Sequence, residues 1–155
     1  MKAAVLYGKG SMKIKNVDTP RAKDDEGFIR VKAASICGTD VHFYKGEMET
    51  GSPRILGHDF SGVIEKTGKD VKGFSKGDRV TAEIVRYCGD CHFCKIGNYQ
   101  LCVNAVYMGF EVDGAFAEYV VAPVKNVFKI PNNVSFEEAA IMEPVALALH
   151  VMDFV

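Results

Sequence analysis

Four of the five cysteines in this chain lie within fifteen residues, in the stretch YCGDCHFCKIGNYQLC. They are spaced C-x2-C-x2-C-x7-C and are Cys88, Cys91, Cys94 and Cys102. Short C-x2-C steps let thiolates converge on one ion, and four sulfurs at about 2.3 Å fill a tetrahedral zinc shell. An iron–sulfur cluster also takes four thiolates, so the spacing leaves both metals open. We predict a closed, structural metal site, with His92 at the surface because the cysteines already fill the shell.

A second group of potential metal ligands is spread over three distant segments. Cys37 lies in SICGTDVHFYKG, His58 and Asp59 lie in GHDFSG, and Glu143 lies in MEPVA. Each of them has an ordinary structural role: a small buried thiol, a hydrogen-bonded imidazole, a turn aspartate, and a glutamate favoured by a helix dipole. Taken one at a time, these residues therefore do not predict a second metal site.

The composition is that of an ordinary globular domain. The chain has 155 residues, of which 48% are hydrophobic and 25% charged, and its formal net charge is -1. This charge favours neither nucleic acid nor an anionic membrane as a partner, and no apolar run approaches the roughly 20 residues that span a bilayer. The odd number of cysteines and the lack of an export signal in MKAAVLYGKG favour metal-held thiolates in a reducing compartment, the cytoplasm.

Short segments rich in β-branched and aromatic residues, separated by glycine and proline, predict a mainly β fold. We expect strands at 3–6, 12–17, 27–35, 60–68, 77–85, 115–123 and 126–130. Helical signals are few: one turn at 38–46, a capping box formed by Ser135 and Glu138, and a terminal helix with Pro144 at its first position. No G-x-G-x-x-G follows a strand, so a nucleotide cofactor would be bound mainly by residues outside this chain.

The stretch EPVALALHVMDFV, residues 143–155, predicts an apolar helix without a glycine cap or a basic last turn. A helix this apolar normally packs against a further segment. We therefore expect the chain to be one part of a longer polypeptide.

The stretch GHDFSGVIEKTGKDVKGFSKGDRV resembles the signature of the zinc-containing medium-chain alcohol dehydrogenases. The matching positions are Gly57, His58, Gly62, Gly68, Val71, Gly77, Asp78, Arg79 and Val80. ICGTDVH resembles the catalytic cysteine segment of that family, and the four-cysteine stretch resembles its structural zinc loop. DGAFAEYVVAP and EEAAIMEPVALALH are also similar to family segments, so the resemblance covers nearly the whole chain.

The resemblance implies a mainly β fold, a GroES-like, partly open β-barrel with a few short helices and a zinc-binding loop. It implies that residues 1–143 form the catalytic domain. Residues 144–155 would then begin a helix that leads into a Rossmann domain absent from this chain. That absent domain would bind most of the NAD or NADP.

The resemblance also implies two Zn²⁺ ions per chain, one structural in the four-cysteine loop and one catalytic. Cys37 and His58 are the expected catalytic ligands, with Glu143 bound directly or through water. Asp59 stands where the family has glutamate. Because its side chain is one methylene shorter, Asp59 either ligates zinc or acts from behind the ligands.

The pair Glu143–Pro144 is similar to the glutamate–proline pair that sorbitol, butanediol and threonine dehydrogenases carry at this position. The longer segment EPVALALH resembles the sorbitol- and butanediol-type polyol enzymes best. The resemblance thus implies an NAD(P)-linked alcohol or polyol dehydrogenase, which oxidises a secondary alcohol to a ketone through a zinc alkoxide and hydride transfer. Thr39 and His42 would pass the departing proton to solvent. The full-length enzyme would be a homodimer or homotetramer acting on a small alcohol, without nucleic-acid or membrane partners, and the isolated fragment would be inactive.

Other functions compete with this interpretation. Oxidation of an amino alcohol, as in threonine dehydrogenases, uses similar motifs, and a non-catalytic zinc adaptor needs only the cysteine loop. A zinc-free reductase of the quinone-reductase type is disfavoured, because such relatives lack both the cysteine loop and the Cys37–His58 pair. The substrate, and the choice between NAD and NADP, stay open at this point.

Overall fold

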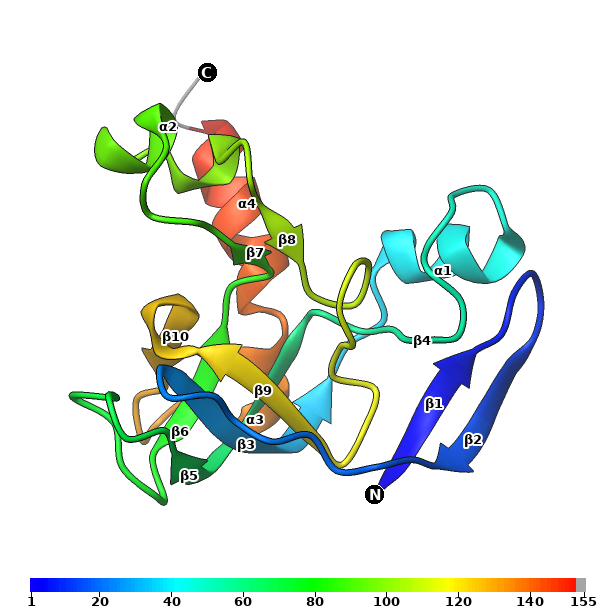
Figure 1. The fold of residues 1–155 in the computed structure, drawn as a ribbon, viewed down its shortest axis with the longest axis horizontal. Coiled ribbons are helices and arrows are strands. Elements are labelled where there is room, and N and C mark those ends of the chain that lie inside the picture. Colours follow the sequence, from blue (N-terminus) through cyan, green and yellow to red (C-terminus); the bar gives the residue numbers. More distant parts are fainter. Residues whose placement is uncertain (153–155) are drawn as a thin grey trace.

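A computed structural model describes residues 1–152 and consists of three antiparallel sheets and a few short helices (Figure 1). The largest sheet has five strands in the order β10-β6-β5-β3-β9. Its members are β3 (Glu26–Ala34), β5 (Phe60–Thr67), β6 (Arg79–Ala82), β9 (Tyr119–Pro123) and β10 (Val127–Lys129). Each of these strands falls within a segment predicted from its β-branched and aromatic residues, apart from small differences at the ends.

The N-terminal hairpin forms a second, smaller sheet beside the first. β1 (Lys2–Leu6) pairs with β2 (Met12–Asn16) and with the short β4 (Arg54–Ile55). The segment before β9 joins the two sheets, because the Ala4 N–H donates to Phe116 O at 2.8 Å. Two sheets joined in this way give the mainly β, partly open barrel that was predicted.

The strand predicted at 77–85 is interrupted. Its first part is β6, and its end belongs to β7 (Val85–Arg86), which pairs with β8 (Val106–Tyr107) in a separate small sheet. Asn126 stabilises the break: its backbone O accepts the Glu83 N–H at 2.9 Å, and its side-chain amide donates to Val85 O at 2.6 Å. The chain therefore leaves the large sheet at Glu83, on its way to the cysteine-rich segment.

The helices are short except for the last. They are α1 (Gly38–Lys45), α2 (His92–Lys95), α3 (Phe136–Ala140) and α4 (Met142–Met152), with 3-10 turns η1 (Tyr99–Leu101) and η2 (Val124–Asn126). α1 has about two turns rather than the one predicted, and it ends as predicted at Gly46, in the left-handed conformation. None of the described helices is both long and apolar enough to cross a membrane.

The last helix corrects one prediction. α4 begins at Met142, so Pro144 is its third residue and not its first. Proline is still tolerated there, because the first four N–H groups of a helix have no partner within the helix. Residues 153–155 of the predicted helix lie outside the described residues.

The main hydrophobic core lies against the large sheet and extends to residues outside it, among them Val85 of β7 and Met108. Its most deeply buried members are Ile29, Phe60, Ile64, Val80 and Met108. A smaller cluster under α1 contains Leu6, Phe43 and Leu56. Leu56 and Phe60 flank residues 57–59, so core packing on both sides fixes the position of the predicted ligands between them.

Candidate metal centres

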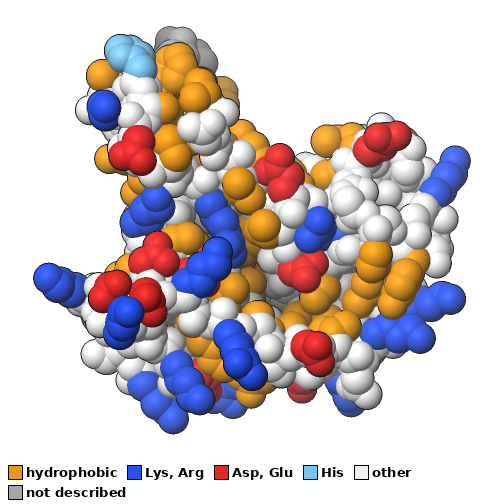
Figure 2. All heavy atoms as spheres, in the orientation of Figure 1, with side chains coloured by type: hydrophobic (Ala, Val, Ile, Leu, Met, Phe, Trp, Pro, Cys, Tyr) orange, Lys and Arg blue, Asp and Glu red, His pale blue; other side chains and the backbone are white. Residues whose placement is uncertain are grey.

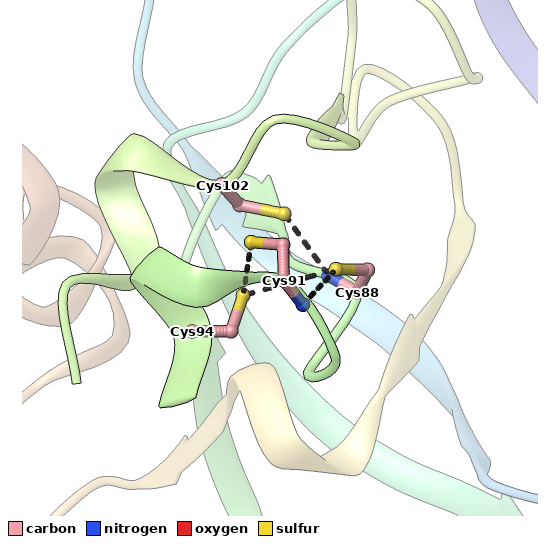
Figure 3. A group of neighbouring side chains, drawn as sticks. All are labelled: Cys88, Cys91, Cys94 and Cys102. Carbon is pink, nitrogen blue, oxygen red and sulfur yellow. Dashed lines mark hydrogen bonds between the residues drawn. The ribbon is translucent and has the colours of Figure 1, made fainter. Parts of the chain in front are cut away.

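The four predicted structural ligands gather in a lobe formed by residues 88–102 (Figure 3). Their sulfur atoms all lie within 4.8 Å of one another. Cys94 Sγ lies 3.5 Å from Cys91 Sγ and 3.9 Å from Cys88 Sγ. A tetrahedral zinc ion with sulfurs at about 2.3 Å requires sulfur–sulfur separations of about 3.8 Å, whereas a disulfide requires about 2 Å. The lobe therefore has the dimensions of four thiolates around one ion.

Backbone N–H groups point at two of these sulfurs and favour the thiolate form. The N–H groups of Asp90 and Cys91 each donate to Cys88 Sγ at 3.4 Å, and the Cys88 N–H donates to Cys102 Sγ at 3.2 Å. The bonds from Asp90 and Cys91 lower the pKa of Cys88 to about 6. Burial has the opposite effect on Cys94 and raises its pKa to about 12. A bound cation would allow all four cysteines to ionise together.

Cys37 is held at the N-terminus of α1. It is the N-cap residue, and its backbone N–H donates to Asp40 Oδ2 at 3.0 Å, as in a capping box. Asp40 is buried, and its other oxygen accepts the Gly57 N–H at 3.2 Å. One carboxylate therefore joins the segment that carries Cys37 to the segment that carries His58.

His58 and Asp59 lie between β4 and β5, and each is only 3% exposed. Gly57 comes just before them and has a positive φ of 88°. A Cβ at this position would overlap the Phe116 ring. His58 Nε2 is 3.9 Å from Asp59 Oδ1, and His58 Nδ1 is 3.8 Å from Asp40 Oδ1. Both separations exceed a hydrogen bond. His58 Nδ1 and Asp59 Oδ1 therefore have no hydrogen-bond partner among the described residues.

The sulfur of Cys37, a ring nitrogen of His58 and a carboxylate oxygen of Asp59 lie within 4.8 Å of one another. We call these three residues the assembled site. Burial is the main reason that the pKa of Asp59 lies above its usual value, and a buried carboxylate oxygen without a partner is costly unless a cation compensates it. Thiolate, imidazole and carboxylate are the groups that bind zinc, and three protein ligands leave one position open. The assembled site thus fits a zinc ion.

Glu143 lies near the assembled site but is not a member of the group of three. It is half-buried in the first turn of α4, where burial and then the charge of Asp59 raise its pKa. Burial and the charge of Glu143 in turn raise the pKa of Glu83. The two glutamates line a cavity of about 650 Å³ between α4 and the edge formed by β6 and β10. Glu143 therefore lies outside the group of three. The carboxylate within that group belongs to Asp59, which stands where the resembling family has glutamate.

The residues predicted to carry the proton occupy different surroundings. Thr39 Oγ1 lies 3.7 Å from Cys37 Sγ, so its hydroxyl is next to the assembled site. His42 is on the exposed side of α1, where its Nδ1 lies 2.5 Å from Glu47 Oε2. His92, predicted to be a surface residue, is exposed at the start of α2. The structure therefore brings Thr39, but not His42, into contact with the candidate ligands.

Residues 23–132 match the alcohol dehydrogenase GroES-like domain. The chain belongs to this family. Within the GroES-like family, sorbitol dehydrogenase of Bacillus subtilis (strain 168) is 40% identical to the chain over 155 residues, which cover 97% of the chain and 44% of that protein. L-threonine 3-dehydrogenase of Deinococcus deserti is 40% identical over 139 residues, which cover 87% of the chain and 40% of that protein. The resemblance to zinc-containing medium-chain dehydrogenases is confirmed.

A solved structure of a GroES-like relative has the same fold. A short chain alcohol dehydrogenase from Escherichia coli CFT073, complexed with NADH, has a TM-score of 0.92 and 36% identity. The match covers 99% of this chain and 45% of that one. The chain thus spans less than half the length of each of these three relatives.

Two contacts of the assembled site were not predicted from the sequence of this GroES-like domain. Asp40 accepts the Cys37 N–H at the start of α1, and it also accepts the Gly57 N–H. Phe110 packs edge-on against His58, with ring centroids 5.1 Å apart, and gives the site an apolar wall. The capping-box spacing of Cys37 and Asp40 signals the first role of Asp40. Nothing local signals the second role, because Gly57 is seventeen residues away.

Proposed function

We propose that this chain is the catalytic domain of a zinc-dependent, NAD(P)-linked alcohol or polyol dehydrogenase, which oxidises a secondary alcohol to a ketone. The observation that carries the proposal is the assembled site, where a thiol, an imidazole and a carboxylate are close together. Two polar atoms of this site lack hydrogen-bond partners within residues 1–152. The proposal includes two Zn²⁺ ions per chain, one in the assembled site and one in the lobe.

A zinc ion bound in the assembled site would act as a Lewis acid toward the alcohol oxygen. Cys37, His58 and Asp59 would hold it, and Glu143 would face it directly or through water. Asp40 would orient the site, because its carboxylate accepts the backbone N–H groups of Cys37 and Gly57. Its Oδ1 also lies 3.8 Å from His58 Nδ1. The Phe110 ring, which makes a T-shaped contact with the His58 ring, would keep water away from one side of it.

Removal of the alcohol proton is assigned to α1. The Thr39 hydroxyl, which is next to Cys37, would accept the alcohol proton while its own proton passes on toward His42. His42 would deliver the proton to solvent, because its ring is exposed and bonded to the Glu47 carboxylate. Thr39 and His42 lie three residues apart on one helix, so they can face the same side of it.

The hydride acceptor would be NAD or NADP, in keeping with the NADH in the E. coli relative. Residues 1–143 would form the catalytic domain, and residues from 144 on would lead into a nicotinamide-binding domain outside this chain. The chain matches only 44% of the B. subtilis sorbitol dehydrogenase, which supports this assignment. The complete enzyme would be a cytoplasmic homodimer or homotetramer.

Oxidation of an amino alcohol is the second candidate, because L-threonine 3-dehydrogenase of D. deserti is also 40% identical to the chain. A non-catalytic zinc adaptor has less support, since the lobe alone would serve it and the buried assembled site would be unnecessary. The face drawn in Figure 2 also mixes Lys and Arg with Asp and Glu, whereas a predominantly basic patch or stripe is typical of nucleic-acid binding.

A substrate screen of the full-length protein tests the proposal. The zinc-loaded protein would be assayed with NAD and then NADP against polyols, vicinal diols and threonine. We expect reduction of one cofactor with a polyol or diol, and loss of this activity after removal of zinc. Turnover of threonine alone would favour the second candidate. No turnover with any of these alcohols would contradict the proposal.

A further inference from the structure

Arg79, the arginine of the signature, holds the segment between β10 and α3. Its Nη1 donates to Pro131 O and to Asn132 O, both at 3.1 Å, and its Nη2 donates to Val134 O. The guanidinium carbon also lies 4.5 Å from the centroid of the Phe136 ring. One side chain on β6 therefore binds three carbonyls of the segment and packs on the first residue of α3.

Ser61 holds the same helix from the neighbouring strand. It is fully buried on β5, and its Oγ donates to Phe136 O at 2.6 Å. Ser61 follows Asp59 by two residues, so the strand that anchors α3 is continuous with the assembled site. We call Arg79 and Ser61 the α3 clamp.

α3 connects the clamp to Glu143 by a short path. The helix begins in a capping box and buries Ala139 and Ala140 where it packs on β3 and β5. Only Ile141 separates α3 from α4, and Glu143 comes seven residues after Phe136. A displacement of α3 would therefore move Glu143 with it.

We propose that Arg79 and Ser61 are positioning residues, which clamp α3 and thereby set the distance between Glu143 and the assembled site. This inference rests on the proposed function, because it requires a metal ion in that site. Arginine suits the position since its planar fork reaches several carbonyls at once, whereas the single ammonium of lysine cannot reproduce that geometry.

A double-mutant cycle in the full-length protein tests the inference, with Co²⁺ in the assembled site and zinc retained in the lobe. The variants are Arg79→Met, Glu143→Gln and the pair, and the readouts are the Co²⁺ dissociation constant and visible absorption spectrum. Arg79→Met should weaken Co²⁺ binding about 10-fold and change the spectrum in the direction that Glu143→Gln does. The pair should then be no worse than Glu143→Gln alone. An equal loss from Arg79→Met in both backgrounds would overturn the positioning role.

Further variants separate this role from general stability. Arg30→Met removes a guanidinium that pairs with Glu65 at 2.8 Å on neighbouring strands, and it should leave Co²⁺ affinity unchanged. Arg79→Lys should restore only part of the affinity, and full rescue would overturn the need for the fork. If Arg79→Met does not fold, Ser61→Ala takes its place in the cycle, with the same expected and contradicting results.

The premise can fail separately from the inference. If Glu143→Gln alone leaves the affinity and the spectrum unchanged, Glu143 is no part of the metal environment. The proposed ligand set is then wrong at that residue, and the positioning role falls with it. If Glu143→Gln changes both readouts and the cycle shows no coupling, only the positioning role is wrong.

Discussion

The lobe takes all four of its candidate ligands from residues 88–102, whereas the assembled site takes three from segments twenty-one residues apart. Tight turns are enough to bring the lobe cysteines together, and four sulfurs leave no position for a substrate. The assembled site needs α1, the loop before β5 and the Asp40 bridge between them. Its three donors leave a position open. The lobe, whose four ligands fill the shell, is thus suited to stabilise a segment. The assembled site, whose three ligands leave one position open, is suited to bind a reactant.

The two centres also differ in how their negative charge is stabilised. Cys88 and Cys91 are partly exposed, and backbone N–H groups already point at the sulfur of Cys88. His58 and Asp59 are almost fully buried, and one atom of each has no hydrogen-bond partner among the described residues. The assembled site therefore depends more on the charge of a bound ion than the outer part of the lobe does.

The substitution Cys37→Ala in the full-length protein is the strongest test of the difference between the assembled site and the lobe. Dehydrogenase activity should fall by roughly 1,000-fold or more, because the Lewis acid loses a ligand. Metal analysis should show one zinc lost and the lobe zinc retained, with an unchanged circular dichroism spectrum. Retention of activity would show that the assembled site is not the catalytic one.

Cys91→Ser examines the other centre. It should release the lobe zinc and lower the free energy of unfolding by several kcal/mol, since binding of a structural zinc contributes directly to folding. Thermal unfolding with and without a chelator would measure the effect. Zinc in the assembled site should remain. An unchanged melting temperature after loss of the lobe zinc would mean that the lobe does not stabilise the fold.

Asp59→Asn sharpens the description of the assembled site. The amide removes the negative charge and keeps the size, so zinc affinity at this site should fall about 10- to 100-fold. Competition with a chelator would measure the affinity, and Asp59→Glu, which restores the family residue, is the matched control. If Asp59→Asn binds zinc as tightly as the native chain, the carboxylate does not contact the ion.

The smallest expected effect comes from Ser135→Ala, at the start of α3. Loss of the capping box should cost about 1 kcal/mol of stability and leave both zinc sites occupied. The Ser135 backbone N–H, which the substitution keeps, donates to Glu138 Oε2 at 2.7 Å and is the main reason that the pKa of Glu138 is lowered. That contribution is present above the ordinary glutamate pKa and is lost as the pH falls through the lowered one, and most of it is common to both chains. Denaturant titrations at neutral and acidic pH should therefore show a difference between the two chains that largely persists on acidification, because the bond lost, from the Glu138 N–H to Ser135 Oγ, joins two groups that do not titrate.

Much of the fold could be predicted because it depends on neighbours along the chain. The strands β1 and β2, the end of α1 at Gly46 and the capping box at Ser135 were predicted from local residue types, and all of them are observed. The family motifs predicted the barrel. The start of α4 was missed by two residues, since Pro144 is tolerated anywhere in a first turn.

The sequence by itself determined the lobe, because its four cysteines are close enough for turns alone to unite them. Only the tertiary structure decided that Asp59 joins Cys37 and His58, and that Asp40 bridges to Gly57. It also decided that Arg79 binds the segment before α3. These contacts join residues that strand pairing and core packing bring together, and no pattern of residue types along the chain specifies such distances.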